Sequence, residues 1–485
     1  MVIVIFFISF LLFTFDLFPL KAILGAKIQH YFINALSIDI FLVILQTQNL
    51  IILNNMKKIL TLLLLGVTLS VAAQTAREEI RKNPYLAGSN YVDYNRQIPE
   101  FQYTKAPDGY VPFYFTHYGR HGSRWLIGKD DYNRVLRPLQ KGRKYGKLTQ
   151  EGERVLNELE KFNITTYKRL GELTTVGERQ HHGIGSRIAK NFPEIFLSKN
   201  VAIDARSTVV IRCILSMEAE CEELMAANPT ARIHNDVSEA FQYYLNQEWE
   251  GKVKESSGHV NRRQVAEFND RNTHPERLMK VLFNDPQWTA DSIHQRTLMR
   301  QLFEMVINMQ SHDGAPTSLI NIFTEDERYD LWRQNNVGWY LRYANSPMTD
   351  NNMPFSQFNL LTNIIETADT CVALGKPQAT MRFGHEVCVM PLACLMELGN
   401  CNISVENLDD LDKYWQNYKI FPMGCNIQLI FYKPEKGEGD ILVKAMLNER
   451  EVTLPVEQAT ATPYYYKWND LRQYWANKLD KFKEE

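Results

Sequence analysis

Three short apolar segments of the chain each lead directly into a cluster of polar and charged residues. Each segment has the length and composition of a buried strand, and glycine or small polar residues bound it. The segments and the residues that follow them are 111–116 (VPFYFT) before 117–124 (HYGRHGSR), 201–205 (VAIDA) before Arg206, Ser207, Thr208 and Arg212, and 380–383 (TMRF) before 384–386 (GHE). This pattern predicts three strands whose ends carry the polar chemistry of the chain.

Helical patterns separate the first of these strands from the second. The stretches 150–162 and 175–192 have the spacing and length of helices. Strands that alternate with such helices are typical of an α/β fold, with a mostly parallel central sheet flanked by helices. In sheets of this kind ligands bind outside the carboxyl ends of the strands. The three polar clusters are therefore expected to meet in one site.

The rest of the chain divides into a helical stretch and a closing segment. Residues 225–350 contain amphipathic patterns such as 276–283 and 289–309, and we expect an all-helical subdomain inserted into the α/β core. The core is then formed by 74–224 and 351–485. The closing strands of the core are expected at 426–432 (NIQLIFY) and 440–447 (DILVKAML).

The segment 56–73 has the three parts of a secretory signal peptide. Met56 is followed by two lysines, an apolar run spans 59–69, and the small residues Val71-Ala72-Ala73 end the segment. Cleavage is expected between Ala73 and Gln74, so we expect an exported protein, in the periplasm or outside the cell.

Residues 1–55 precede this signal, although signal peptides stand at a true N-terminus. One interpretation is a spurious upstream extension, translated from a start codon placed too early. The other is one or two membrane segments, because 1–15 is an uncharged apolar run just short of the roughly 20 residues that span a bilayer. Asp16 and Lys21 interrupt the apolar run, so the first interpretation is favoured and stable membrane anchoring is not expected.

The charge balance and the cysteines argue against two kinds of partner. The formal net charge is −2, which gives no reason to expect nucleic acid. The seven cysteines lie between Cys213 and Cys425, without a C-x-x-C and without zinc-like spacing. No structural metal site is therefore expected, and the pairing of the cysteines stays open.

The sequence Arg120-His121-Gly122-Ser123-Arg124 places two guanidinium groups around one imidazole. Guanidinium groups bind phosphate oxygens through paired hydrogen bonds and stay charged at any relevant pH. Two neighbouring positive charges disfavour the protonated imidazole, which keeps the histidine neutral and able to act as a nucleophile. Taken alone, the motif fits a basic surface loop better, but its place after an expected strand favours a phosphate site.

Four motifs, in order, resemble the histidine acid phosphatases, the second branch of the histidine phosphatase superfamily. Residues 114–124 (YFTHYGRHGSR) resemble the R-H-G-x-R signature, and 173–177 (LTTVG) are similar to the L-T-x-x-G helix start. Residues 212–216 (RCILS) resemble the arginine and serine that complete the phosphate pocket. Residues 384–386 (GHE) stand where the family has its second histidine and its acid.

The C-terminal part of the chain indicates a subgroup within this family. Residues 422–426 (PMGCN) and 444–450 (KAMLNER) resemble the ending of multiple inositol polyphosphate phosphatases, which remove phosphates from phytate and related compounds. That subgroup usually carries His-Ala-Glu. Here His385 is followed directly by Glu386, at the position where most other histidine acid phosphatases have their acid.

The resemblance implies a two-step phosphate transfer. His121 is expected to attack phosphorus and form a phosphohistidine. Glu386 is expected to protonate the leaving oxygen and then to activate water, a role that needs a raised pKa. The phosphate oxygens are expected to bind Arg120, Arg124, Arg212 and His385. No metal or other cofactor is expected, because the arginines supply the positive charge, and the partner is a small phosphomonoester.

Two further residues have an open assignment. His117 lies four residues before His121 and is expected either to touch the substrate or to be an ordinary loop residue. Arg206 follows the second strand and either reaches phosphate or pairs with Asp204 or the next helix, and the structural role is favoured.

The sequence therefore predicts an exported, metal-independent phosphomonoesterase of the histidine acid phosphatase type that acts on inositol polyphosphates. Two alternatives stay open. One is a broad-specificity acid phosphatase for small phosphomonoesters, and the other is a surface protein that binds phosphate without hydrolysing it. The presence of both a nucleophile and an acid argues against the binding protein, because binding alone needs neither.

Overall fold

One mixed sheet organises the part of the chain that the computed structural model describes, residues 75–96 and 103–484. The strands are β1 (Tyr110–Arg120), β2 (Ala202–Ser207), β3 (Arg232–Val237), β4 (Gln378–Gly384), β5 (Asn426–Pro434), β6 (Leu442–Leu447), β7 (Arg450–Val452) and β8 (Tyr466–Lys467). They lie in the order β3-β2-β4-β1-β5-β6-β7, and β8 pairs with β6. The pairs from β3 to β1 are parallel, and the pairs that involve β5 or β6 are antiparallel.

Helices cover both faces of the sheet and form a separate helical part. The 3-10 helix η1 is Pro84–Tyr91, and the α-helices are α4 (Ala76–Lys82), α5 (Asn133–Lys144), α6 (Gln150–Thr165), α7 (Thr175–Asn191), α8 (Pro193–Phe196), α9 (Ile211–Ala227), α10 (Gln242–Leu245), α11 (Gly251–Ser257), α12 (Arg262–Arg271), α13 (Glu276–Leu282), α14 (Pro286–Ser292), α15 (Gln295–Asn308), α16 (Glu325–Tyr343), α17 (Phe358–Leu374), α18 (Glu386–Leu395), α19 (Leu411–Tyr414), α20 (Asn417–Ile420) and α21 (Trp468–Glu484). The expected α/β fold with flanking helices is confirmed.

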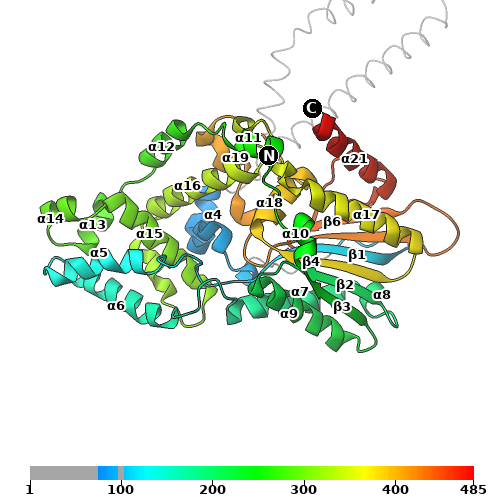
Figure 1. Cartoon of the computed structure of the whole chain (residues 1–485), viewed down its shortest axis with the longest axis horizontal. Coiled ribbons are helices and arrows are strands. Elements are labelled where there is room, and N and C mark those ends of the chain that lie inside the picture. The colour runs from blue at the N-terminus through cyan, green and yellow to red at the C-terminus, as the bar shows by residue number, and fades with distance from the viewer. Residues whose placement is uncertain (1–74, 97–102, 485) are drawn as a thin grey trace, which may run out of the picture. The chain divides into compact units, whose positions relative to one another are not determined.

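The side chains of β1 alternate between two hydrophobic clusters. The helices α17, α18 and α21 lie on one side of the sheet and α7, α8 and α9 on the other (Figure 1). Tyr114 and Tyr118 pack in the cluster of the first side, whereas Phe115 packs in that of the second. This alternation is the two-residue period of a strand that is buried on both faces.

The strand β1 is longer than the sequence predicts. The expected strand ended at residue 116, but the observed pairing continues to Arg120. The reason is that β1 has neighbours on both sides, since Gly119 pairs with Phe383 in β4 and with Asn426 in β5. A strand between two partners keeps its backbone groups hydrogen-bonded even where the side chains become polar.

The helical part draws on more of the chain than the expected range 225–350. One hydrophobic cluster joins α13, α15 and α16 to α5, α6 and η1, which come from before that range, and β3 lies within it. The expected pattern 289–309 is divided between α14 and α15, because the backbone of Ile293 is extended. Among the described residues, no helix is long and apolar enough to cross a bilayer.

The carboxyl ends of three parallel strands lie side by side. Arg120 at the end of β1 is paired with Gly384 at the end of β4, and Ser207 at the end of β2 is paired with Phe383 of β4. The three polar clusters of the sequence therefore meet at one edge of the sheet.

Candidate active site

The loop after β1 is held by backbone hydrogen bonds from its neighbours. The Arg120 amide donates to the carbonyl of Cys425 (2.8 Å), and the His121 amide donates to the carbonyl of Gly384 (3.0 Å). The Gly122 amide donates to the hydroxyl of Ser216 on α9 (3.1 Å). These hydrogen bonds fix the backbone on either side of His121. The position of the imidazole is therefore set by the sheet and by α9.

The start of α7 packs against the same loop and explains the L-T-x-x-G motif. Thr174 is the N-cap of α7, and its hydroxyl accepts from the Gly177 amide (3.2 Å) and donates to the Ser123 carbonyl (3.0 Å). A side chain at Gly122 would lie under 3.0 Å from the Gly177 carbonyl, so both glycines are required by close approach. Gln180, one turn further, accepts from the Ser123 amide (2.8 Å).

The imidazole of His121 is held in one tautomer. Nδ1 lies 2.8 Å from the Gly122 carbonyl, which only accepts, so Nδ1 carries the proton and Nε2 keeps its lone pair. Burial lowers the pKa of His121 well below its ordinary value, and the charges of Arg212, Arg120 and Arg124 lower it further. The imidazole is therefore neutral and held in one orientation, as the sequence predicts.

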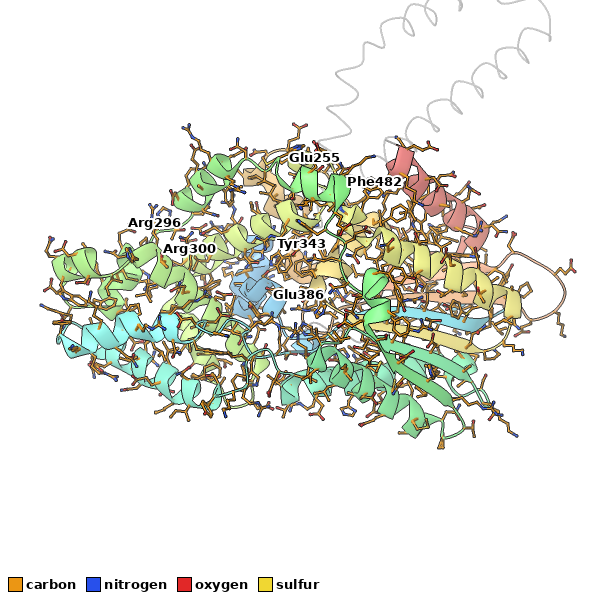
Figure 2. The ribbon with its side chains drawn as sticks, in the orientation of Figure 1. Glu255, Arg296, Arg300, Tyr343, Glu386 and Phe482 are labelled. Atoms are coloured by element: carbon orange, nitrogen blue, oxygen red, sulfur yellow. The ribbon has the colours of Figure 1, made fainter. Side chains whose placement is uncertain are left out.

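Glu386 begins α18 (Figure 2), and its carboxylate contacts both the imidazole of His121 and the arginines. Its carboxylate is 2.9 Å from Arg120 Nη2, 3.9 Å from Arg124 Nη2 and 3.6 Å from His121 Nε2. The Asn90 amide donates to the same carboxylate (3.3 Å). Burial alone would raise the pKa of Glu386, but the charges of Arg120 and Arg124 lower it to about 2. This direction is opposite to the raised pKa that the proposed acid needs.

The three arginines of the site differ in how they are anchored. Arg120 is fully buried, and its Nη1 donates to the carbonyls of Asn90 (2.6 Å) and Phe421 (3.1 Å). Arg124 lies over the ring of Tyr91, 5.4 Å from its centroid. Arg212 on α9 donates to the carbonyl of Gly171 (3.3 Å). All three also contribute to the low pKa of His121, so the structure brings the expected phosphate-binding residues together.

His385 completes the group from the end of β4. Its ring centroid lies 5.6 Å from that of His121, and its Nε2 is 3.4 Å from the Thr208 hydroxyl. Burial lowers the pKa of His385 to about 4, with a smaller opposing effect of Glu386. Above that pH His385 is therefore a neutral imidazole beside His121.

The two residues with an open assignment lie apart from this group. His117 is in β1, fully buried on the α7 and α9 side, with Nε2 4.0 Å from a Glu220 carboxylate oxygen. Arg206 is in β2, and its guanidinium contacts Asp204 (3.0 Å) and the Tyr244 hydroxyl (3.2 Å). Neither side chain has a hydrogen bond or ion pair with the arginine and histidine group in the part of the chain that the structure describes.

Sequence reasoning missed Asn90 and Tyr91, which contact Glu386, Arg120 and Arg124 from η1. The segment that carries them has no strand or helix period and no motif, so no local signal marks it. Thr208 had such a signal, because it directly follows β2 at the carboxyl edge of the sheet.

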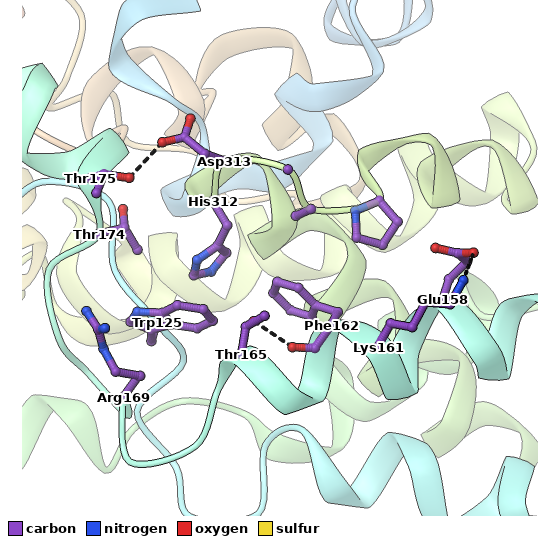
Figure 3. A pocket seen from close by; sticks show the side chains of 13 residues that line it. Trp125, Glu158, Lys161, Phe162, Thr165, Arg169, Thr174, Thr175, His312 and Asp313 are labelled. Carbon is purple, nitrogen blue, oxygen red and sulfur yellow. Dashed lines mark hydrogen bonds and ion pairs between the residues drawn. The ribbon is translucent and has the colours of Figure 1, made fainter.

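Trp125, the residue after Arg124, lines a cavity of about 390 Å³ (Figure 3). The ring centroid of Trp125 is 3.9 Å from that of His312. The charged side chains that line the cavity form ion pairs with one another or with nearby residues. Lys161 contacts Glu158 (3.3 Å) and Arg169 contacts Glu172 (2.5 Å). This cavity therefore lacks the excess of positive charge that marks the group around His121.

The geometry around His121 is suited to a phosphoryl group. One neutral nitrogen lone pair, three guanidinium groups and one carboxylate meet in a buried place, and the arginines give it a net positive charge. Guanidinium groups can bind the equatorial oxygens of a transferring phosphoryl group while the imidazole lies in line for attack.

Comparison with solved structures gives consistent neighbours. The multiple inositol polyphosphate phosphatase of Bifidobacterium longum in complex with inositol hexasulfate is 17% identical, with a TM-score of 0.60, over 80% of this chain and 96% of that chain. The same protein with phosphate is 18% identical, with a TM-score of 0.60, over 81% and 97%. The phytase from D. castellii is 16% identical, with a TM-score of 0.60, over 81% and 85%.

No protein-family model and no curated protein matches the chain. The structural neighbours nevertheless cover nearly the whole described range with the same arrangement of sheet and helices. The chain therefore has the fold of the multiple inositol polyphosphate phosphatase and phytase structures, as the four motifs predict.

Proposed function

We propose that this chain is a phosphomonoesterase of the histidine acid phosphatase type, acting through a phosphohistidine on inositol polyphosphates. The observation that carries the proposal is the orientation of His121: its Nδ1 is bound to the Gly122 carbonyl, and its Nε2 faces Glu386 and the arginines. A site for binding alone has no need of a nucleophile whose pKa is kept low.

In the first proposed step the phosphate oxygens bind Arg120, Arg124 and Arg212, and Nε2 of His121 attacks phosphorus. The bond from phosphorus to the leaving oxygen breaks as that oxygen takes the proton of Glu386. In the second step water attacks phosphorus, Glu386 takes the proton of the water, and the bond from phosphorus to Nε2 breaks. A ring N–H of His385 donates to a phosphate oxygen, and the arginines carry the charge, so no metal is needed.

The substrate class is inferred from charge and from the neighbours. The Bifidobacterium protein was solved with inositol hexasulfate, an inositol ring with an anion on each carbon. In this chain Arg296 and Arg300 on α15 continue a row that begins at Asn308, whose amide donates to the Arg124 carbonyl (3.2 Å). Arg296 is paired with Asp270 (2.7 Å), so we expect Arg300 to be the arginine of this row that meets a distal phosphate when one phosphate is at His121.

Export is proposed from the signal-peptide pattern, with cleavage between Ala73 and Gln74 and with residues 1–55 as an upstream extension. N-terminal sequencing of the secreted protein tests this directly. Gln74 as the first residue is the expected result, and an N-terminus before Met56 would contradict it.

The experiment that tests the activity measures phosphate release from phytate and from an aryl phosphate, at mildly acid pH with EDTA present. Wild type is compared with His121→Ala and with His182→Ala, a half-buried histidine on α7 that lies outside the site. We expect release by wild type and His182→Ala and none by His121→Ala. Cleavage of the aryl ester alone would favour a broad-specificity phosphatase, and cleavage of neither a phosphate-binding protein.

A further inference from the structure

The carboxylate of Glu386 contacts the same guanidinium groups that are proposed to bind phosphate. It is 2.9 Å from Arg120 and 3.9 Å from Arg124, and it adds a hydrogen bond from Asn90 (3.3 Å). Its side chain is only 9% exposed, so these contacts replace most of its contact with water. A phosphate group that binds Arg120 and Arg124 through their Nη2 atoms therefore competes with Glu386 for them.

This exchange changes the charge around Glu386. At present two guanidinium groups favour its ionised form. A phosphate dianion on those groups removes this stabilisation and places like charge beside a buried carboxylate. The ionised carboxylate then has burial and repulsion against it, and protonation relieves both.

Few of the titratable groups near Glu386 can take up a proton when an anion binds. Burial raises the pKa of Tyr91, Cys213 and Cys388 to about 12, so these groups stay neutral. Burial also raises the pKa of Tyr343 and of Cys425. The remaining groups in contact or in electrostatic range are Arg120, Arg124, Arg212, His121 and His385. The arginines are already charged, so a proton that enters with the anion goes to Glu386 or to an imidazole.

We propose that binding of a tetrahedral dianion displaces Glu386 from Arg120 and Arg124, and that Glu386 takes up one proton from solvent in the same event. This inference rests on the proposed function. It gives the source of the acid: the carboxylate becomes a carboxylic acid only when a phosphate group is bound, and it then passes that proton to the leaving oxygen as the bond to phosphorus breaks. The substrate thus prepares the group that cleaves it.

The test is calorimetric titration of the purified protein with inorganic sulfate between pH 5 and 8. Sulfate keeps its charge over this range and is not hydrolysed, so proton exchange belongs to the protein. Repeating each titration in buffers of different ionisation enthalpy gives the number of protons taken up. We expect an uptake that approaches one proton, and a dissociation constant that rises about tenfold per pH unit where uptake is complete.

Two isosteric variants identify the group that takes up the proton. Glu386→Gln is expected to bind sulfate without proton uptake and with little change of affinity with pH. Glu304→Gln is the matched control: burial raises the pKa of this second acid, which lies near Tyr91 and Arg124, and uptake is expected to persist in the variant. Uptake that survives in Glu386→Gln, or that is lost in Glu304→Gln, would assign the proton elsewhere and overturn the inference.

Two other results would also overturn it: sulfate binding by wild type without proton uptake, and no sulfate binding at all. Neither depends on turnover. Failure of the proposed function appears instead as absent phosphate release from phosphomonoesters, so the two failures are distinguishable. Circular dichroism of Glu386→Gln at each pH checks that the variant is folded. A loss of proton uptake is then not caused by unfolding.

Discussion

At the scale of single residues, the role of Glu386 can be separated from that of His121 by the leaving group. An acid that protonates the leaving oxygen matters most for a poor leaving group, such as the alkoxide of an inositol ring. We expect Glu386→Ala to lower kcat on phytate by about 10²–10⁴ and to lower it far less on an activated aryl phosphate. Steady-state kinetics on both substrates gives the answer.

The control for this prediction is Glu222→Ala, which removes an exposed acid of α9. It is expected to leave both rates unchanged. If kcat of Glu386→Ala falls by the same factor on both substrates, the carboxylate acts on phosphate binding or on His121 and not on the leaving oxygen.

The sequence could predict that these residues meet and that His121 is neutral, but not that the pKa of Glu386 is low. His121, Arg120 and Arg124 stand together in one motif, and charge alone predicts a neutral imidazole. The low pKa of Glu386 depends on contacts with residues more than 260 positions away in the chain, and no local pattern encodes them. Asn90 has the same difficulty, since it lies 296 positions from Glu386 and 30 from Arg120.

At the scale of elements, the packing of α7 on the nucleophile loop predicts a sharp difference between two glycines. A methyl group at Gly122 meets the Gly177 carbonyl, whereas one at Gly338, on the exposed side of α16, meets nothing within 4 Å. We expect Gly122→Ala to cost about 1–3 kcal/mol of unfolding free energy and most of the activity. We expect Gly338→Ala to gain about 0.5–1 kcal/mol with activity unchanged.

Urea unfolding and phosphate-release assays on both variants test this. Equal stability of the two variants would mean that the loop and α7 separate easily, and the close approach would then have no role in holding His121.

The helix α15 carries a second prediction at this scale. Arg300 is exposed on the row that leads from Arg124 through Asn308 and Glu304. We expect Arg300→Ala to raise KM for phytate several-fold and to leave an aryl phosphate unaffected, because only phytate has distal phosphates. Arg263→Ala on α12, whose side chain is 89% exposed, is the matched control and should change neither.

The salt dependence distinguishes this effect from a local change of structure. The rate on phytate should fall with ionic strength more steeply in wild type than in Arg300→Ala, since one screened attraction is missing from the variant. Parallel salt curves would place Arg300 outside the path of the substrate.

Sequence patterns predicted the elements better than their ends. The sequence pattern located β1, β2 and β4 as short apolar runs, and α6 and α7 by their helical spacing. It did not predict that β1 continues through His117 to Arg120, since that extension depends on partners on both sides. Nor did it predict the break between α14 and α15, where apolar residues continue across an extended residue.

At the scale of the whole molecule, several histidines are buried in their neutral form, and they link stability to pH. Burial lowers the pKa of His312 to about 3 and that of His117 to about 4, from an ordinary value of 6.5. The unfolded chain therefore binds protons between these values and pH 6.5 that the folded chain does not. Stability is fully present above pH 6.5 and is lost as the pH falls through this window.

His312 gives the cleanest test of this linkage, because its shift comes from burial and only one acid, Asp313, opposes it. We expect the unfolding free energy of wild type to fall as the pH is lowered from 6.5 to 4. In His312→Asn the fall should be shallower by about 1 kcal/mol per pH unit, since one proton-binding site of the unfolded chain is gone. His234→Asn, whose side chain is 72% exposed, is the control and should follow wild type. Denaturant unfolding at each pH measures the slopes, which do not depend on how much either substitution costs at neutral pH. Parallel curves for wild type and His312→Asn would show that His312 binds a proton as readily in the folded protein as in the unfolded chain, and would contradict its burial in the neutral form.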